Sequence, residues 1–503
     1  MGPDSCVKLR PCVLIGASLA IAMSTFFIEQ FGCRATQADG AAIERQLREQ
    51  GFSLAPSSIS ADVVVLNTCT VTAAADTQAR DAIRKLHAAS PSTRILVTGC
   101  YAQRAPEELA AIPGVSFVVG NSHKPQIPAL LQSISAVSLK PSSQNPFVGA
   151  ELVHPDSGGA RPARSAQENP SASPAPILIG DIRDLSNVLV APVLGGEGNH
   201  TRPTLKIQDG CNSRCSFCVI PSVRGKSRSL PPQTVLSEIQ RLADSGFREI
   251  VLSGINLGTY GRDLTPRVEF LDLLRRILGE TSVERLRISS IEPLDVTQDL
   301  IEFFSSHDRI APHFHMPLQS ASDPILAAMH RWYRAEHYAR RVELIHAYLP
   351  HAAIGADVIA GFPGESDSDH AATLDFIASR PFTYLHVFSY SQRPGTRAAA
   401  LPHQLLGHII KRRARELRAL AARKSAAFRE SQFGRTLRVL TLRRDPADDP
   451  NFTPALSENY LTVQLSVALP PNQWMDAVVT HAAGAPLFAT PVESSALSLT
   501  GVT

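Results

Sequence analysis

The sequence has few cysteines and little net charge. Eight of its 503 residues are cysteine, and they do not follow the spacing of a disulfide framework. This scarcity argues against a small secreted disulfide-rich protein and favours a reducing cytoplasm. The formal net charge of +3 is too small to establish nucleic-acid binding, so any basic binding surface must come from local clusters.

The sequence also lacks an apolar run long enough to cross a membrane. The apolar stretch from Pro11 to Met23 follows Lys8 and Arg10, as in a signal peptide, but it is too short to span a bilayer. We expect no membrane association, and we interpret residues 1–22 as an extension without a structural role. A targeting segment is the alternative interpretation. The chain length predicts two to four domains.

Residues 23–135 alternate short apolar runs with helical patterns, which predicts a parallel sheet covered by helices. Three of the expected strands end on a cysteine, namely Cys33, Cys69 and Cys100. Parallel strands share one direction, so these cysteines should meet at the carboxyl edge of the sheet, where open α/β folds bind ligands. The alternative is that they are three small buried hydrophobic residues.

Residues 136–200 contain a stretch rich in Ser, Pro, Ala and Gly, which predicts a flexible linker or insertion. Residues 201–432 then repeat strand and helix six times, which predicts a partial (β/α)6 barrel with its active face at the carboxyl ends of the strands. The expected strands lie in 204–210, 248–256, 285–293, 312–319, 353–363 and 384–391. Short strand patterns in 433–495 predict a small β-barrel.

The loop after the first barrel strand carries three more cysteines, Cys211, Cys215 and Cys218, with no fourth cysteine close by. Thiolates suit zinc or iron–sulfur clusters, but structural zinc needs four ligands. A cluster of four irons held by three cysteines keeps one iron open for a small chelating ligand. A zinc knuckle is the alternative.

This spacing in this loop resembles the radical S-adenosylmethionine superfamily. Further motifs extend the likeness over residues 24–430 and are similar to the methylthiotransferase family: GC at 32–33, NTCTVT at 67–72, TGCYAQ at 98–103, CNSRCSFCVIPSVRGKSRS at 211–229, GINLGTYGRDL at 254–264, PLQSAS at 317–322, GADVIAGFPGE at 355–365 and YSQRPGTRA at 390–398.

The resemblance implies two 4Fe-4S clusters and S-adenosylmethionine as cofactors. Cys211, Cys215 and Cys218 would hold the catalytic cluster that cleaves S-adenosylmethionine to a radical. Cys33, Cys69 and Cys100 would hold a second cluster that binds the sulfur to be inserted. One S-adenosylmethionine would methylate that sulfur, and the radical made from another would remove hydrogen from a substrate carbon. Both must act on one atom in a site that excludes water.

The resemblance also implies where the cosubstrate binds. Its positions are strand-end residues of the barrel: Ser253, Asn256, Ser289, Glu292, Gly361 and Gly364. Ordinary turn chemistry is the alternative for each of them. We interpret His313 and His315, which alternate along one strand, as packing or polar lining of the barrel.

Basic residues suggest a nucleic-acid surface. They follow the second cysteine set and begin a basic helix at 411–430, and we predict that they contact RNA: Arg224, Lys226, Arg228, Lys411, Arg412 and Arg413. A solvated helix face is the alternative. In the family, the C-terminal region is an RNA-binding TRAM domain, an OB-like barrel.

Two motifs, at 254–264 and 386–398, are most similar to the branch that adds a methylthio group to C2 of N6-threonylcarbamoyladenosine at position 37 of tRNA. The alternatives are the same chemistry on N6-isopentenyladenosine-37 of tRNA or on an aspartate of a ribosomal protein, and a non-enzymatic iron–sulfur RNA-binding protein. We expect a cytoplasmic monomer served by a one-electron reductant of flavodoxin or ferredoxin type. The sequence does not identify the sulfur donor.

Overall fold

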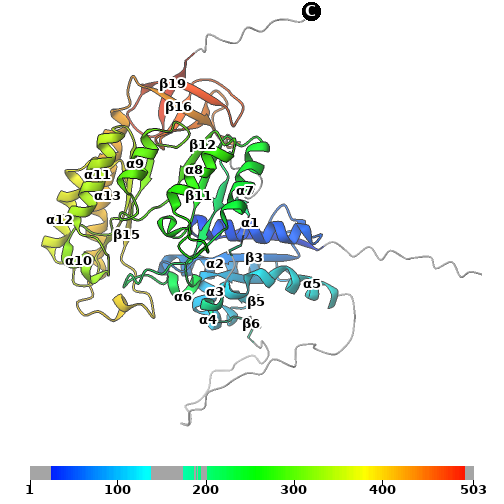
Figure 1. Cartoon of the computed structure of the whole chain (residues 1–503). Helices are drawn as coiled ribbons and strands as arrows, with labels where there is room; N and C mark the ends of the chain where they lie inside the picture. Colours follow the sequence, from blue (N-terminus) through cyan, green and yellow to red (C-terminus); the bar gives the residue numbers. More distant parts are fainter. Residues whose placement is uncertain (1–23, 138–173, 186–187, 190, 194–200, 493–503) are drawn as a thin grey trace, which may run out of the picture.

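The computed structural model describes residues 24–137, 174–185, 188–189, 191–193 and 201–492. The predicted extension at 1–22 and most of the predicted linker at 136–200 lie outside these residues. The described chain forms an N-terminal sheet domain, a partial barrel and a small C-terminal barrel (Figure 1). This arrangement confirms the predicted α/β fold class.

The N-terminal domain is a six-stranded sheet in the order β2-β1-β3-β4-β5-β6, and all its strand pairs are parallel. Its strands are β1 (Thr25–Gln30), β2 (Ser53–Leu54), β3 (Val63–Thr68), β4 (Arg94–Gly99), β5 (Val115–Gly120) and β6 (Ile177–Leu178). Its helices are α1 (Arg34–Glu49), α2 (Ala73–Ala89), α3 (Cys100–Arg104), α4 (Pro106–Ala110), η1 (Asn121–Gln126) and α5 (Ile127–Val137). Strand β6 comes from the predicted linker.

Helices cover both faces of this sheet. Val63 and Val65 of β3 pack in one core with residues of α1 and α5. Val64 and Leu66 point the other way and pack in a second core with residues of α2, α3 and α4. The apolar run of β3 is uninterrupted because both faces of the strand are buried.

The partial barrel has six parallel strands in chain order: β8 (Thr204–Lys206), β11 (Glu249–Ser253), β12 (Arg285–Ile288), β13 (His313–His315), β14 (Ala353–Ala360) and β15 (Tyr384–Ser389). Isolated parallel bridges join β12 to the β13 side. The helices are α6 (Ile220–Arg224), α7 (Pro232–Asp244), α8 (Phe270–Glu280), α9 (Gln298–Ser305), α10 (Asp323–Ala328), α11 (Ala335–Tyr348), α12 (Asp367–Ala378) and α13 (Gly407–Glu430). Each predicted stretch contains its observed strand.

Short elements complete the barrel region. They are η2 (Ile182–Asp184), β7 (Pro192–Val193), β9 (Gln208–Asp209), β10 (Arg228–Ser229), η4 (Leu257–Thr259) and η5 (Arg397–Ala400). Strand β7 pairs antiparallel with β8, so the described end of the predicted linker extends the barrel sheet.

The C-terminal unit is a closed five-stranded barrel in the order β16-β17-β18-β20-β19. Its strands are β16 (Thr436–Thr441), β17 (Thr453–Ser457), β18 (Thr462–Leu465), β19 (Trp474–His481) and β20 (Leu487–Pro491). The side chain of Arg287, which is fully buried in β12, donates to the carbonyl oxygens of Ser457 and Glu458 at 3.2 and 3.0 Å. The small barrel is therefore fastened to the partial barrel through its 457–460 turn.

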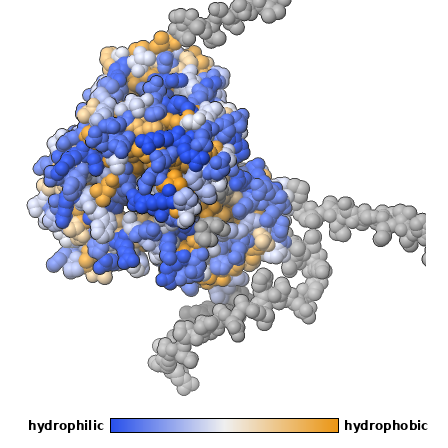
Figure 2. Space-filling view, in the orientation of Figure 1, coloured by the Kyte–Doolittle hydropathy of each residue, from blue (hydrophilic) through white to orange (hydrophobic). Residues whose placement is uncertain are grey.

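The surface is mostly hydrophilic. In the view of Figure 2, apolar side chains gather near the centre of the face, over the partial barrel. Among the described helices, none combines the length and the apolar character that crossing a bilayer requires.

Candidate metal centre

The three N-terminal cysteines follow three neighbouring parallel strands. Cys33 comes shortly after β1, Cys69 directly follows β3, and Cys100 directly follows β4. Thr68 and Gly99 are partners in the β3–β4 register, so the next residues, Cys69 and Cys100, lie side by side. Burial raises the pKa of the Cys69 thiol to about 12, and the nearby thiols of Cys100 and Cys33 add to the increase. The three thiols thus lie within electrostatic range of one another.

Glycines allow the chain to turn sharply before two of these cysteines. Gly32 and Gly99 have φ values of +110° and +102°. A Cβ atom on Gly32 would lie 2.5 Å from Cβ of Cys69, and one on Gly99 would lie 2.3 Å from the carbonyl oxygen of Thr68. Only glycine fits both the conformation and the space.

The second cysteine set lies on the loop after β8 and β9. The backbone N–H of Ser213 donates to Sγ of Cys211 at 3.4 Å, and that of Ile220 donates to Sγ of Cys218 at 3.5 Å. A guanidinium N–H of Arg331 donates to Sγ of Cys215 at 3.3 Å. Burial raises the pKa of Cys218 to about 12, and the neighbouring thiols contribute. These donors are suited to stabilising thiolates.

The two cysteine sets belong to one interface. Cys100 packs against Val219 and Val223 in the segment that follows Cys218 directly. The side-chain amide of Asn121 donates to Sγ of Cys100 at 3.6 Å and to the carbonyl oxygen of Val223 at 2.7 Å. The carboxyl edge of the N-terminal sheet therefore lies against the cysteine loop of the barrel.

A buried ion network fastens this interface. The carboxylate of Asp39 in α1 pairs with Lys124 at 2.8 Å, with Arg224 at 3.0 Å and with Lys206. Asp209 pairs with Lys206 at 2.7 Å and with Arg224 at 3.0 Å. Three cations thus face two carboxylates, which leaves one positive charge in excess. The charges of Arg224 and Lys124 also reach the Cys100 thiol, so this excess stabilises negative charge at the N-terminal cysteines.

The donor sets fit iron–sulfur clusters. A single zinc ion with Zn–S bonds of about 2.3 Å would hold its sulfurs about 3.8 Å apart. In the described part of the chain, neither cysteine set has all three sulfurs within 4.8 Å of one another, and no further cysteine is present. A cluster held by three thiolates would supply the positive charge that buried thiolates need.

The strand-end residues predicted to bind the cosubstrate lie near the second set. Ser253, Asn256 and Ser289 are buried, and Oδ1 of Asn256 and Oγ of Ser289 have no hydrogen-bond partner. These two atoms can therefore each form a hydrogen bond with a polar ligand. Glu292 pairs with Arg331, the residue that also contacts Sγ of Cys215. Burial raises the pKa of Glu292, and the charge of Arg331 opposes that increase.

The backbone N–H groups of the two glycines in the GFPG turn form hydrogen bonds within the protein. The N–H of Gly361 donates to Oε2 of Glu365 at 2.8 Å, and the N–H of Gly364 donates to the carbonyl oxygen of His403 at 3.0 Å. Both have positive φ. Their backbone N–H groups are thus already engaged, and their direct contact with a cosubstrate stays a prediction.

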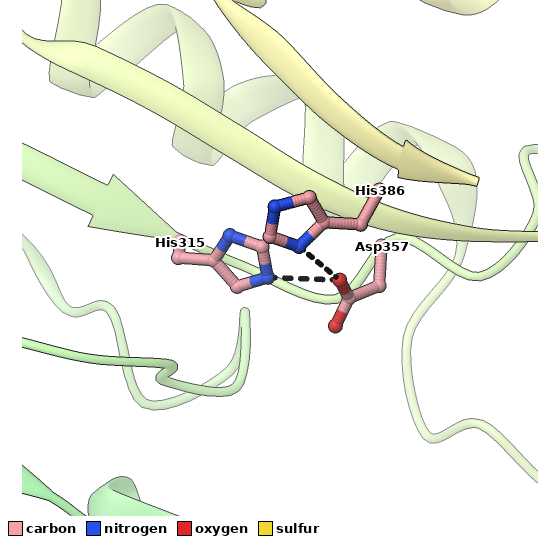
Figure 3. A group of neighbouring side chains, drawn as sticks. All are labelled: His315, Asp357 and His386. Atoms are coloured by element: carbon pink, nitrogen blue, oxygen red, sulfur yellow. Dashed lines mark ion pairs between the residues drawn. The ribbon is translucent and has the colours of Figure 1, made fainter. Parts of the chain in front are cut away.

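A histidine–aspartate group lies on the inner face of β13, β14 and β15 (Figure 3). Oδ1 of Asp357 lies 3.0 Å from Nε2 of His315 and 3.3 Å from Nδ1 of His386. The hydroxyl of Tyr384 lies 2.7 Å from Nε2 of His313 and 3.0 Å from Nδ1 of His315. His313 and His315 therefore line the barrel as polar side chains. The hydrogen bonds from the imidazoles keep the pKa of Asp357 below its usual range although burial opposes this.

The structure corrects half of the predicted RNA contacts. Arg224 belongs to the buried ion network, Arg228 donates to backbone carbonyl oxygens at 2.9 and 3.0 Å, and Arg413 pairs with Glu365 and Asp367 at 2.8 Å. All three are buried, so the prediction that they reach RNA phosphates is wrong. The others are exposed: Lys226, Lys411 and Arg412.

Sequence reasoning missed several residues of the centre. They are Asp39, Lys124, Lys206, Asp209, Arg331, Asp357, Tyr384 and His386. Each acts through a partner on a distant segment, as Arg331 does with Cys215. Two pairs are close in sequence, Lys206 with Asp209 and Tyr384 with His386, but their spacing alone carries no signal.

Known protein families match both the N-terminal domain and the partial barrel. Residues 25–120 match the family described as "Uncharacterized protein family UPF0004", and residues 205–377 match the radical SAM superfamily. A solved radical S-adenosylmethionine methyltransferase, TsrM from Kitasatospora setae, has a similar fold with a TM-score of 0.51 and 15% identity, covering 75% of this chain and 77% of that chain.

Curated relatives are similar over most of their length. The threonylcarbamoyladenosine tRNA methylthiotransferase MtaB of Aquifex aeolicus is 34% identical, covering 87% of this chain and 95% of the relative. The MtaB protein of Bacillus subtilis is 34% identical, covering 88% and 90%. The tRNA-2-methylthio-N(6)-dimethylallyladenosine synthase of Mycolicibacterium smegmatis is also 34% identical, covering 86% and 78%.

These matches agree with the two cysteine sets and with the unpartnered polar atoms at the barrel strand ends. S-adenosylmethionine and 4Fe-4S clusters are the cofactors of such an enzyme. The two domain matches, and the length over which the relatives align, show that the chain belongs to the radical S-adenosylmethionine methylthiotransferase family.

Proposed function

We propose that this enzyme adds a methylthio group to C2 of N6-threonylcarbamoyladenosine at position 37 of tRNA. The observation that carries the proposal is the packing of two three-cysteine sets at one interface. Relatives named as threonylcarbamoyladenosine tRNA methylthiotransferases, 31–34% identical over most of the chain, support the choice of base.

The chain's own residues hold the reactants and stabilise charge. When the cofactors are bound, they supply a hydrogen-abstracting radical and the methylated sulfur. Ser253, Asn256 and Ser289 offer buried polar atoms to S-adenosylmethionine at the strand ends. Arg331 bridges Cys215 and Glu292 and so fixes the cluster loop against the barrel wall. The packing of α6 on Cys100 excludes water from the side where the two cysteine sets meet.

RNA would meet the predicted basic side chains that are exposed, together with further exposed cations of α13. Lys226 follows the loop that carries Cys211, Cys215 and Cys218. Helix α13 presents further exposed cations, namely Lys411, Arg412, Arg415, Arg418 and Arg423. Cations at this density neutralise phosphates and make binding dependent on salt. The closed C-terminal barrel has the TRAM-like, OB-like architecture expected of an RNA-binding module.

Nucleoside mass spectrometry tests the proposed substrate. tRNA from cells with and without the gene should differ in 2-methylthio-N6-threonylcarbamoyladenosine. A difference confined to the isopentenyl derivative would replace the proposed base by that of the dimethylallyladenosine synthases, which are equally identical relatives. Modification of ribosomes and not of tRNA would overturn the tRNA assignment.

Two cysteine substitutions test the division of labour between the cysteine sets. Cys215→Ala should abolish 5′-deoxyadenosine formation under reducing anaerobic conditions, because it removes a ligand of the radical cluster. Cys69→Ala should retain that cleavage but stop methylthio transfer. Iron content and circular dichroism establish that each variant is folded. Equal loss of cleavage in two folded variants would refute the assignment.

We also expect a one-electron reductant of flavodoxin or ferredoxin type and a sulfur donor whose identity the sequence does not give. We expect the enzyme to act as a monomer in the cytoplasm, where the substrate tRNA is found. Size-exclusion chromatography with light scattering of the cluster-loaded protein tests the oligomeric state.

A further inference from the structure

Arg34 is a cation that has no acidic partner among the described residues. It is the first residue of α1, directly after Cys33, and it is half-buried. One of its guanidinium N–H groups donates to the hydroxyl of Tyr460 at 3.1 Å. In the described part of the chain, no carboxylate lies within ion-pair distance of Arg34, whereas near the same centre Arg224 pairs with two carboxylates and Arg331 with one.

Arg34 lies beside the inner face of the partial barrel. The ring of Tyr460 stacks on His313 with 4.3 Å between ring centroids and lies 5.9 Å from that of Tyr384. Burial raises the pKa of Tyr384, and the charge of Arg34 is among those that oppose the increase. The guanidinium therefore lies near Tyr384, whose hydroxyl contacts His315 of the histidine–aspartate group in Figure 3.

This inner face is open and polar. Phe314, Ile354 and Val358 belong to the core that packs on the helices, so the alternate residues of the same strands point into the barrel. The side chain of Asp357 is 23% exposed and that of His386 is 57% exposed. A ligand can thus reach the wall that Arg34 borders.

The chemistry of the proposed substrate matches this wall. The threonylcarbamoyl group carries a carboxylate, a hydroxyl and a urea-like linkage, whereas an isopentenyl group is wholly apolar. In adenine, C2 and C6 flank N1, so a base whose C2 faces the cysteine sets directs its N6 substituent to one side. Arg34 directly follows Cys33, and its guanidinium contacts the hydroxyl of Tyr460, whose ring stacks on His313 of the barrel wall, so we place Arg34 on the route of such a substituent.

We propose that Arg34 binds the carboxylate of the threonylcarbamoyl group and thereby selects this base over adenosines with an uncharged N6 substituent. A guanidinium can bind a carboxylate through two parallel hydrogen bonds. Tyr460 is a positioning residue, because its hydroxyl holds the guanidinium in place. The inference rests on the proposed function and adds to it the residue that reads the substrate.

Binding measurements test the selection directly. Anticodon stem-loop RNAs carry at position 37 either N6-threonylcarbamoyladenosine or its carboxyl methyl ester. Wild-type cluster-loaded enzyme, without reductant, should bind the acid about 10- to 100-fold more tightly than the ester, the size expected of one charge-assisted pair. Arg34→Met should bring this ratio close to one by weakening binding of the acid, and Arg34→Lys should keep part of it.

Three comparisons sharpen the test. Tyr460→Phe should reduce the ratio less than Arg34→Met, and rates of methylthio transfer to the two RNAs should follow the binding ratios. Arg84→Met removes an equal charge from the exposed side of α2 and should leave the ratio unchanged. Iron content and circular dichroism identify folded variants. If Arg34→Met does not fold, Arg34→Lys and Tyr460→Phe decide.

The outcomes separate the two proposals. Failure of the wild-type enzyme to modify the acid-bearing RNA would overturn the proposed function. A wild-type enzyme that modifies it, together with an unchanged acid-to-ester ratio in the Arg34 variants, would overturn only the role of Arg34. Equal weakening of both RNAs would make Arg34 a general RNA contact and would likewise overturn its role in selection.

Discussion

Replacing Asp39 by asparagine should destabilise the protein strongly. Asp39 is 2% exposed and is the acid that Lys124, Lys206 and Arg224 share. Burial would raise the pKa of Asp39, but the charges of Arg224, Lys124 and Lys206 outweigh it and hold that pKa well below its usual range. The carboxylate is therefore ionised in the folded protein, and Asp39→Asn would leave three buried cations facing one remaining carboxylate, that of Asp209.

The expected loss is about 3–5 kcal/mol, the size observed when one partner of a buried ion pair is removed. A chain of this length unfolds with an entropy of roughly 1 kcal/mol per kelvin, so the melting temperature should fall by about 3–5 °C. Anaerobic thermal melting of the cluster-loaded enzyme, followed by circular dichroism, measures this shift. Glu280→Gln breaks an exposed pair with Arg276 and should cause no measurable change.

A second substitution distinguishes charge imbalance from lost packing. Asp39→Asn combined with Lys206→Met removes one uncompensated cation and should recover part of the melting temperature. The carboxylate also contributes stability above its unfolded pKa near 3.8, and this contribution disappears as the pH falls through the lower folded value. A wild-type melting temperature in Asp39→Asn, or a double variant less stable than the single one, would refute the reasoning.

Two further predictions concern other parts of the molecule. Burial, followed by the charge of Arg287, holds the pKa of His313 well below its usual 6.5, so the folded protein keeps this imidazole neutral and loses stability as the pH falls below about 6.5, where the unfolded chain gains the proton. Melting temperatures of His313→Gln should therefore fall less between pH 7.5 and 5.5 than those of the wild type, and parallel curves would contradict this. Gly99→Ala would force a Cβ to 2.3 Å from the Thr68 carbonyl oxygen, so iron analysis should show one cluster lost while 5′-deoxyadenosine formation continues; full iron content would contradict it.

The sequence allowed the sheet domain and the cysteine positions to be predicted, because both follow from local pattern. Cys69 and Cys100 end apolar runs, and parallel strands bring such ends to one edge. Strand β17 was harder to predict, because Thr453–Ser457 is short and contains Pro454, which weakens the strand pattern. The C-terminal barrel was still recognisable from its other strands.

Basic side chains show why the buried ion pairs of the site could not be predicted from the sequence. Arg224 and Lys226 are two residues apart, yet Arg224 is buried against Asp39, 185 residues away in sequence, and Lys226 is exposed. Whether an arginine reaches solvent or pairs with an acid depends on how separate domains pack. Local pattern contains no information about such partners.

The attachment of Arg287 limits how this enzyme can be re-engineered. Its guanidinium is fully buried and donates hydrogen bonds both to Glu249 and to two backbone carbonyl oxygens of the small barrel. A chimera carrying a foreign RNA-binding module in place of residues 433–492 would have to reproduce those two acceptors. Otherwise the buried guanidinium would lose two of its hydrogen bonds. Exchange of the RNA-binding module therefore requires that the new module keep the 457–460 turn and the positions of its two carbonyl oxygens.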